Sequence, residues 1–327
     1  MKKRISIGLC ICVIGLAITA CGPKGPAPSA GSASPQDMLK MLPAEAQGVF
    51  FVDVHNAMSI EAVDKAIQDD DNYQKYLEFI EETGIDPKKD IYYMAAAVLS
   101  GFAGQGEGGG DGAGVINLKY DPEALLKVIK EKAGENEQEY RETAYQEMAI
   151  YLMKEEDGDE GGFAFLDDSN AVVGTETGIK AVIDVVKGQK PDLTENATLS
   201  SLLEKTRKDT LLWGAMMVPA DASAQAEGNP MLSSLGAVKS VTMNFDYKNG
   251  TIMAEINAQS DDAAKNDQIA AALNGIKAFG SMAAAEKPEI GELMNAIIIS
   301  AVEDGVKISA TLPEELLNKL KASAEEK

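Results

Sequence analysis

Two runs of alternating apolar and polar residues on either side of Asn249-Gly250 constrain the fold of this chain more than any other feature. Apolar side chains recur at every second position in both runs, which is the spacing of a strand with one covered face. They are Val241, Met243, Phe245 and Tyr247 before the turn, and Ile252, Ala254, Ile256 and Ala258 after it. Asn-Gly is the strongest short-range signal for a two-residue hairpin. The sequence therefore predicts an antiparallel strand pair.

A second hairpin is predicted at Glu303-Asp304-Gly305, where it joins Ile297–Val302 to Val306–Leu312. Strands that follow one another through tight turns must pair antiparallel. Two further runs, Ile91–Leu99 and Leu211–Val218, are continuously apolar, as strands covered on both faces are. The fold class that these patterns predict is α+β, with mostly antiparallel sheets and packed helices.

Helices are predicted where apolar residues recur at intervals of three and four. Ile60, Val63 and Ile67 begin one such stretch, and the pattern resumes from Tyr73 to a stop near Gly84. Asp121-Pro122-Glu123 has the cap, the proline and the acidic residue that open a helix. The other predicted helices are Glu176–Lys187 before Gly188, the alanine-rich Ala263–Ala285, and Glu314–Lys321.

The predicted elements repeat as β-α-β-β-α-β-β in each half, with extra strands in the first. Both halves also contain Pro-Glu-x-Leu-Leu after a strand, at Pro122–Leu126 and Pro313–Leu317. We therefore hypothesise an internal duplication with its junction near Pro191–Lys208, giving a first half at 37–190 and a second at 191–327. The alternative is that turns from strand to helix favour proline and glutamate in any case.

The N-terminus has the parts of a secretory signal in the right order. Lys2, Lys3 and Arg4 precede the apolar run Ile5–Ala20, which is shorter than the about 20 residues of a membrane-spanning helix. We therefore predict a signal at 1–20 rather than a transmembrane anchor.

Ile18-Thr19-Ala20-Cys21 resembles the lipobox of bacterial lipoproteins. The resemblance implies cleavage before Cys21 by signal peptidase II and a diacylglyceryl group on its sulfur. It also implies that the membrane is a partner through this anchor. The expected location is the bacterial cell envelope, at the outer membrane, facing the periplasm or the surface, if the host is Gram-negative.

Residues 21–36 are mostly proline, glycine, alanine and serine, too poor in apolar residues to fold. They are predicted to be a disordered tether that starts at the lipidated Cys21, with a root-mean-square reach of roughly 20 Å.

The charge and the cysteines exclude several classes of function. The chain has a formal charge of −22, and removal of the three basic residues of the signal makes it more negative still, which excludes nucleic acid as a partner. Cys10 and Cys12 lie in the signal, and the sulfur of Cys21 is expected to be alkylated. No disulfide, thiolate nucleophile or cysteine metal site is therefore predicted.

None of the motif-like segments carries chemistry in this sequence. Gly104–Gly109 satisfies G-x-G-x-x-G, but a strand is predicted after it instead of a helix. The acidic runs Asp69–Asp71 and Glu155–Glu160 lack the ligand spacing of a calcium loop. His55 is the only histidine, and we interpret it as a strand-edge residue. No catalytic, cofactor-binding or metal-binding residue is predicted, and the chain is not expected to be an enzyme.

Leu42–Val54 and Phe165–Asp184 resemble an uncharacterised family of exported bacterial proteins, which implies an exported α+β domain and no activity. We predict a non-catalytic binding or structural module of the envelope. The alternative is a carrier or sensor of a lipid-like apolar ligand, held in a cavity lined by the methionines of the strands. A third hypothesis is a hydrolase with an unrecognised carboxylate site. The partner is accordingly an unknown envelope protein or an apolar ligand.

Overall fold

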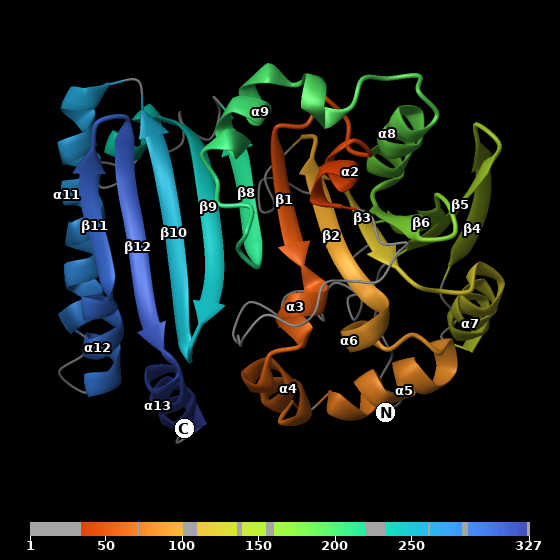
Figure 1. Cartoon of the computed structure of the whole chain (residues 1–327), viewed down its shortest axis with the longest axis horizontal. Coiled ribbons are helices and arrows are strands. Elements are labelled where there is room, and N and C mark those ends of the chain that lie inside the picture. Colours follow the sequence, from red (N-terminus) through yellow and green to blue (C-terminus); the bar gives the residue numbers. More distant parts are fainter. Residues whose placement is uncertain are drawn as a thin grey trace. The chain divides into compact units, whose positions relative to one another are not determined.

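The computed structural model describes residues 34–70, 72–100, 110–135, 139–154, 160–219, 233–260, 262–282 and 287–325 (Figure 1). The chain divides into two compact units, residues 1–200 and 201–327. Among the described residues, every strand pair inside either unit is antiparallel. The predicted α+β class with antiparallel sheet is confirmed. In the described part of the chain, no helix is both long and apolar enough to cross a membrane.

The first unit has a sheet in the order β1-β2-β3-β7-β6-β5-β4 within its described residues. Its elements are α2 (Pro35–Leu39), β1 (Gly48–Asp53), α3 (Val54–Met58), α4 (Glu61–Gln68), α5 (Tyr73–Thr83), α6 (Pro87–Asp90), β2 (Ile91–Val98), β3 (Gly112–Leu118), α7 (Pro122–Glu135), β4 (Tyr140–Tyr145), β5 (Met148–Lys154), β6 (Glu160–Phe165), β7 (Asn170–Gly174), α8 (Glu176–Val186) and the 3₁₀ turn η2 (Leu193–Glu195). Helix α9 (Ala197–Glu204) spans the division between the units.

Helix α8, which the sequence pattern predicted, is deeply buried in this unit. Ile179, Val182 and Ile183 are fully buried on it, and it lies against β3, β6, β7 and β5. Thr175 caps its first turn by accepting from the N–H of Gly178 at 3.1 Å. Helix α5 ends at Gly84, whose φ of 69° is left-handed, so the predicted stop is confirmed by a glycine cap.

The second unit has the strand order β8-β9-β10-β12-β11 in the described residues. Its elements are β8 (Leu212–Met217), the 3₁₀ turn η3 (Ser233–Ala237), β9 (Val238–Lys248), β10 (Thr251–Ser260), α11 (Ala263–Met282), α12 (Pro288–Ala296), β11 (Ile297–Val302), β12 (Gly305–Pro313) and α13 (Glu314–Glu325). Both predicted hairpins are confirmed, because Lys248 pairs with Thr251 and Val302 pairs with Gly305. Asn249 and Gly250 both have positive φ, at 54° and 74°, as a type I′ turn requires.

The two units follow the same path through their sheets. The order β1-β2-β3-β7-β6 in the first matches β8-β9-β10-β12-β11 in the second, and β5 and β4 extend the first beyond β6. Within the described residues, however, only the 3₁₀ turn η3 lies between β8 and β9, where the first unit has α3 to α6.

The shared Pro-Glu-x-Leu-Leu motif does not support the duplication. It begins α7, which follows the third strand of the first unit, but α13, which follows the last strand of the second. The motif thus marks a helix start in two places that do not correspond, as the alternative explanation holds.

Several predictions need correction. The tether does not extend to Gln36, because Ser34 and Asp37 form a capping box that starts α2 at Pro35. His55 is not at the edge of a strand, because the Asp53 side chain caps a helical turn, α3, directly after β1. Strand β2 is not covered on both faces along its whole length, since only Ala95 and Ala97 are buried in it.

Some predicted features lie outside the described residues. They are the signal, Cys21 and the tether up to residue 33, Gly104–Gly109, Asp71, and residues 155–159 of the second acidic run.

Candidate functional site

The strand register of the second unit arranges apolar side chains in four rows on one face of its sheet. Positions paired across β9, β10, β12 and β11 share a row, and alternate positions share a face. The first row, Val241, Ala258, Val306 and Ala301, packs with Ile269 and Ala270 of α11 in one core cluster. This contact identifies the face that α11 covers.

The last row, formed by Tyr247, Ile252 and Leu312, lies where the chain turns into α13. Tyr247 is 6% exposed and Ile252 is 3% exposed. The Tyr247 hydroxyl donates to Glu314 Oε2 at 2.7 Å, and Leu316 of α13 is also buried. The last row is therefore buried at Tyr247 and Ile252, as the first is at Val306.

The two rows between them are only half-buried. Every one of their eight side chains keeps part of its surface exposed. They are Met243, Ile256, Ile308 and Ile299 in one row, and Phe245, Ala254, Ala310 and Ile297 in the next. We call these eight residues the apolar band.

Helix α11 carries further exposed apolar surface. Ile269, Leu273 and Ile276 are four and three residues apart, so they form one stripe on the helix. Ile269 is fully buried and Leu273 packs against the same core, yet Ile276 is 40% exposed. Phe279, three residues further, is 65% exposed. The apolar stripe of α11 thus continues beyond the core of the unit.

The polar face of β9 is the more deeply buried of its two faces. Thr242, Asn244 and Asp246 are between 1% and 4% exposed. The Asn244 amide donates to the Arg207 carbonyl oxygen at 2.9 Å and to Thr210 Oγ1 at 3.2 Å. The segment before β8 therefore covers the polar side, and burial on β9 is the reverse of what its alternation indicates.

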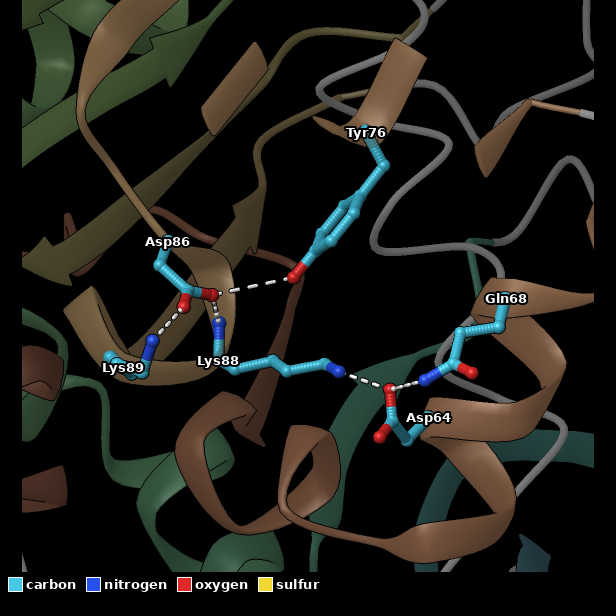
Figure 2. Close-up of polar contacts among 6 residues, drawn as sticks. All are labelled: Asp64, Gln68, Tyr76, Asp86, Lys88 and Lys89. Carbon is cyan, nitrogen blue, oxygen red and sulfur yellow. Dashed lines mark hydrogen bonds and ion pairs between the residues drawn. The ribbon is translucent and has the colours of Figure 1, made fainter. Parts of the chain in front are cut away.

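A polar cluster of the first unit joins α4, α5 and α6 (Figure 2). Lys88 Nζ donates to Asp64 Oδ1, which also accepts from Gln68 Nε2 at 2.9 Å. Asp86 caps α6 by accepting from the Lys88 N–H at 3.1 Å, and it also accepts from Lys89 Nζ at 2.6 Å. The Tyr76 hydroxyl donates to Asp86 Oδ1 at 3.3 Å.

The electrostatics of this cluster favour a structural role. The hydrogen bond from Lys88 holds the pKa of the Asp64 carboxyl below its usual value. Burial opposes the charge on Asp86, but the hydrogen bond from Lys89 and the cap outweigh it, so its pKa is also lowered. Burial, and then the Asp86 carboxylate, raise the pKa of the Tyr76 phenol well above its ordinary value. A neutral phenol and two carboxylates with lowered pKa are poor proton acceptors at neutral pH.

Of the hollows on the surface of the described residues, the two best defined are not enclosed apolar cavities. One of about 510 Å³ lies at the hairpin between β4 and β5, and one of about 340 Å³ lies between α12 and α13. The first is lined by Glu142, Thr143, Ala144, Glu147, Met148 and Ala149, and the second by Pro288, Glu289, Glu292, Lys319, Ala322 and Ser323. Of the strand methionines, only Met148 lines either hollow.

The remaining candidates from the sequence are not brought together. His55 lies in α3 with its Nδ1 buried and without a hydrogen-bond partner, and its ring centroid is 6.0 Å from that of Tyr92. Asp69 is the C-cap of α4, and Asp70 accepts from the N–H of Asn72. Across the described ranges, no three histidine, cysteine, aspartate or glutamate side chains are grouped so that they could hold a metal ion.

The comparisons with known proteins give resemblances in structure only. No protein-family model matches the chain, and no curated protein matches it in sequence. Crystal form III of TP0453 has a TM-score of 0.49 and 11% identity, with 88% of this chain and 98% of that chain covered. Crystal form I has a TM-score of 0.45 and 10% identity, with 88% and 97% covered. A likeness of this size carries neither an activity nor a partner from that protein to this chain.

Proposed function

We propose that the protein is a non-catalytic binding module of the bacterial cell envelope, anchored by a lipid on Cys21, and that its second unit binds a partner protein through the apolar band. The observation that carries the proposal is the pair of half-buried apolar rows between rows that contact α11 and α13; Ile299 packs against the core under α11, yet all eight side chains of the band stay partly exposed. Apolar side chains that share one patch mark interaction surfaces more often than isolated ones do.

The size of the band defines its role in such an interface. Its two rows are about 7 Å apart along the strands, and its four strands span about 14 Å, by standard strand spacings. A patch of that size is much smaller than the about 800 Å² that each partner contributes to a stable interface. The band is therefore proposed as the apolar centre of an interface, with Ile276 and Phe279 of α11 extending it and polar residues as the rim.

The carrier of an apolar ligand is the alternative function. It requires a concave site that encloses most of the ligand, whereas no band residue lines either of the two hollows described above. The hydrolase hypothesis requires a carboxylate available as acid or base. The carboxylates of Figure 2 are instead engaged by lysines or by a helix cap.

The anchor gives the binding module its proposed place. Two or three acyl chains on Cys21 hold a protein stably at a membrane, whereas a single chain does not. The negative charge of the protein opposes direct adsorption to anionic headgroups. We propose that the protein is tethered in this way at the outer membrane of a Gram-negative host, within reach of other envelope proteins.

Photo-crosslinking in the native envelope tests the function. A photoreactive amino acid is placed at Phe245 or Ile256 in the band, and at Ser309 or Thr311 on the other face of β12 as matched controls. The proposal predicts adducts of one defined protein mass at the band positions only, which Ile308→Glu in the same chain abolishes. Adducts with lipid alone support the carrier instead. Equal adducts at all four positions, or none at any, overturn the proposed interface.

A further inference from the structure

Strand β11 is the outer strand of the second unit's sheet, and its sequence gives it none of the usual protection against pairing. Among the described residues it pairs with β12 on one side only. Its residues, Ile297–Val302, include no charged residue, proline or glycine. An uncharged apolar edge of this kind is a template for the addition of another strand.

The register identifies which backbone groups face outward. Val302 and Gly305 close a two-residue hairpin, so Val302, Ser300 and Ile298 direct their N–H and C=O groups toward β12. Ile297, Ile299 and Ala301 alternate with them and direct theirs away from the sheet. These three positions decide whether another strand can pair with β11.

Helix α11 occupies this outer edge through two polar side chains. Figure 1 shows α11 running beside β11. Lys277 Nζ donates to the Ile297 carbonyl oxygen at 2.5 Å, and Asn274 Nδ2 donates to the Ile299 carbonyl oxygen at 3.3 Å. Two of the three outward carbonyl oxygens that a new strand needs as acceptors, those of Ile297 and Ile299, are thus already engaged by α11.

The apolar surface of this part of α11 is only partly buried. Asn274 also donates to Ala270 of its own helix at 2.9 Å, and Gly280 lies close to Met294 of α12, while Ile276 and Phe279 are 40% and 65% exposed. The glycine at position 275 lies inside the helix and meets no atom within 4 Å of where a Cβ would be. A glycine inside a helix costs about 1 kcal/mol relative to alanine. The contacts of Asn274 and Lys277 therefore matter for keeping this half of the helix against β11.

We propose that Lys277 and Asn274 hold α11 across the outer edge of β11 and thereby prevent it from pairing with β11 of a second copy of this chain. A two-fold axis through Ile299 makes the strand complementary to itself, because it pairs outward-facing positions with one another, Ile297 with Ala301 and Ile299 with itself, and no charge opposes the contact. The same register places the acidic tip Glu303-Asp304 of one copy beside the uncharged Met294-Asn295 of the other. Such a contact is isologous and closes as a dimer.

Association of the full, lipidated chain in detergent tests the proposal by analytical ultracentrifugation. Asn274→Leu with Lys277→Met retains helix propensity and side-chain volume but removes both donors. We expect the dimerisation constant to rise at least about tenfold over that of the unsubstituted chain. The matched control is Lys265→Ala with Gln268→Ala, which removes a lysine and an amide from exposed positions of the same helix and leaves the constant unchanged.

A third variant establishes that β11 is the contact. Adding Ile299→Pro removes an outward N–H that the unit's own sheet does not use, so the ladder with β12 stays intact while strand pairing is lost. Because Ile299 packs against the core under α11, circular dichroism checks that this variant is folded. It is expected to return the double variant to a monomer. A double variant that melts like the unsubstituted chain and stays monomeric overturns the proposal. A dimer that Ile299→Pro does not dissociate also overturns it, because the contact then lies elsewhere. If the double variant unfolds, Lys277→Met alone, with Asn274 retained, is measured by the same criteria.

Discussion

Replacement of Gly178 by alanine has two opposing effects on stability, a gain in helix propensity and a loss from steric overlap. The structure indicates which of the two is larger. Alanine is favoured over glycine inside a helix by about 1 kcal/mol. A Cβ on Gly178 would, however, lie 2.2 Å from the Gly112 carbonyl oxygen and 3.0 Å from the Ala113 nitrogen. Both are backbone atoms of β3, so neither can turn aside as a flexible side chain does.

Helix α8 cannot move away from β3 without disturbing its core. Ile179, Val182 and Ile183 on the same helix are fully buried, and the Thr175 N–H donates to the Gly112 carbonyl oxygen at 3.1 Å. Overpacking costs typically 1–3 kcal/mol, and a clash with backbone belongs at the upper end of that range. After the gain in propensity, we expect Gly178→Ala to lower the free energy of unfolding by about 2 kcal/mol, which lowers Tm by roughly 4–8 °C.

Differential scanning calorimetry and urea unfolding followed by circular dichroism measure this loss. The matched control is Gly275→Ala in α11, where no atom lies within 4 Å of the added Cβ, so propensity alone acts and the free energy of unfolding rises by up to about 1 kcal/mol. Both substitutions replace glycine by alanine in a helix, yet the first should lower the free energy of unfolding and the second should raise it. If Gly178→Ala is as stable as the unsubstituted chain, the close approach of α8 to β3 is refuted.

Three further predictions concern the core, the pH dependence and the anchor. Ile269→Ala empties a fully buried position under α11 and should cost about 2–5 kcal/mol in chemical unfolding, whereas Ile256→Ala in the half-exposed band should cost clearly less. The hydrogen bond from Lys88 lowers the pKa of Asp64 in the folded state from 3.8. Its contribution to the free energy of unfolding is therefore present above about pH 4 and is lost as the pH falls through the lowered pKa. Asp64→Asn should reduce the loss of stability between about pH 4 and 2, and an unchanged pH profile contradicts the ion pair. Intact mass spectrometry should find diacylglyceryl on Cys21 and none after Cys21→Ser, and an unmodified Cys21 would show that the lipobox resemblance misleads.

The features that the sequence predicted correctly depend on residues that are close together in the chain. Asn249-Gly250 can adopt two positive φ values at low cost, so the hairpin could be placed before any tertiary contact was known. The short helices were missed although their start signals were present. Asp86-Pro87 caps α6 and Lys287-Pro288 opens α12, but helices of four and nine residues offer too few turns for an apolar period to stand out.

The apolar band could not be predicted, because its exposure depends on distant parts of the chain. The alternation on β9 indicates two faces and does not say which one is covered. Asn244 is buried because Arg207 and Thr210, more than thirty residues earlier, lie over it and accept its amide protons. Met243 and Phe245, on the other face, are left half-exposed because α11 covers the first row and α13 closes off the last.

The distribution of charge gives an independent reason to assign binding to the second unit. Residues 1–200 contain 34 acidic and 18 basic residues, while residues 201–327 contain 18 and 12. The first unit therefore has most of the formal charge of −22, and a surface of that charge repels other acidic proteins unless they carry a complementary patch. The second unit has a smaller formal charge of −6, from 18 acidic and 12 basic residues, and a partly exposed apolar band, so desolvation on contact costs less there. The lower charge and the exposed apolar surface that favour a partner at the band would also favour pairing between copies of the chain through an uncovered β11. Under the proposal, Lys277 and Asn274 reconcile the two, because they engage carbonyl oxygens at the sheet edge while the apolar band stays partly exposed.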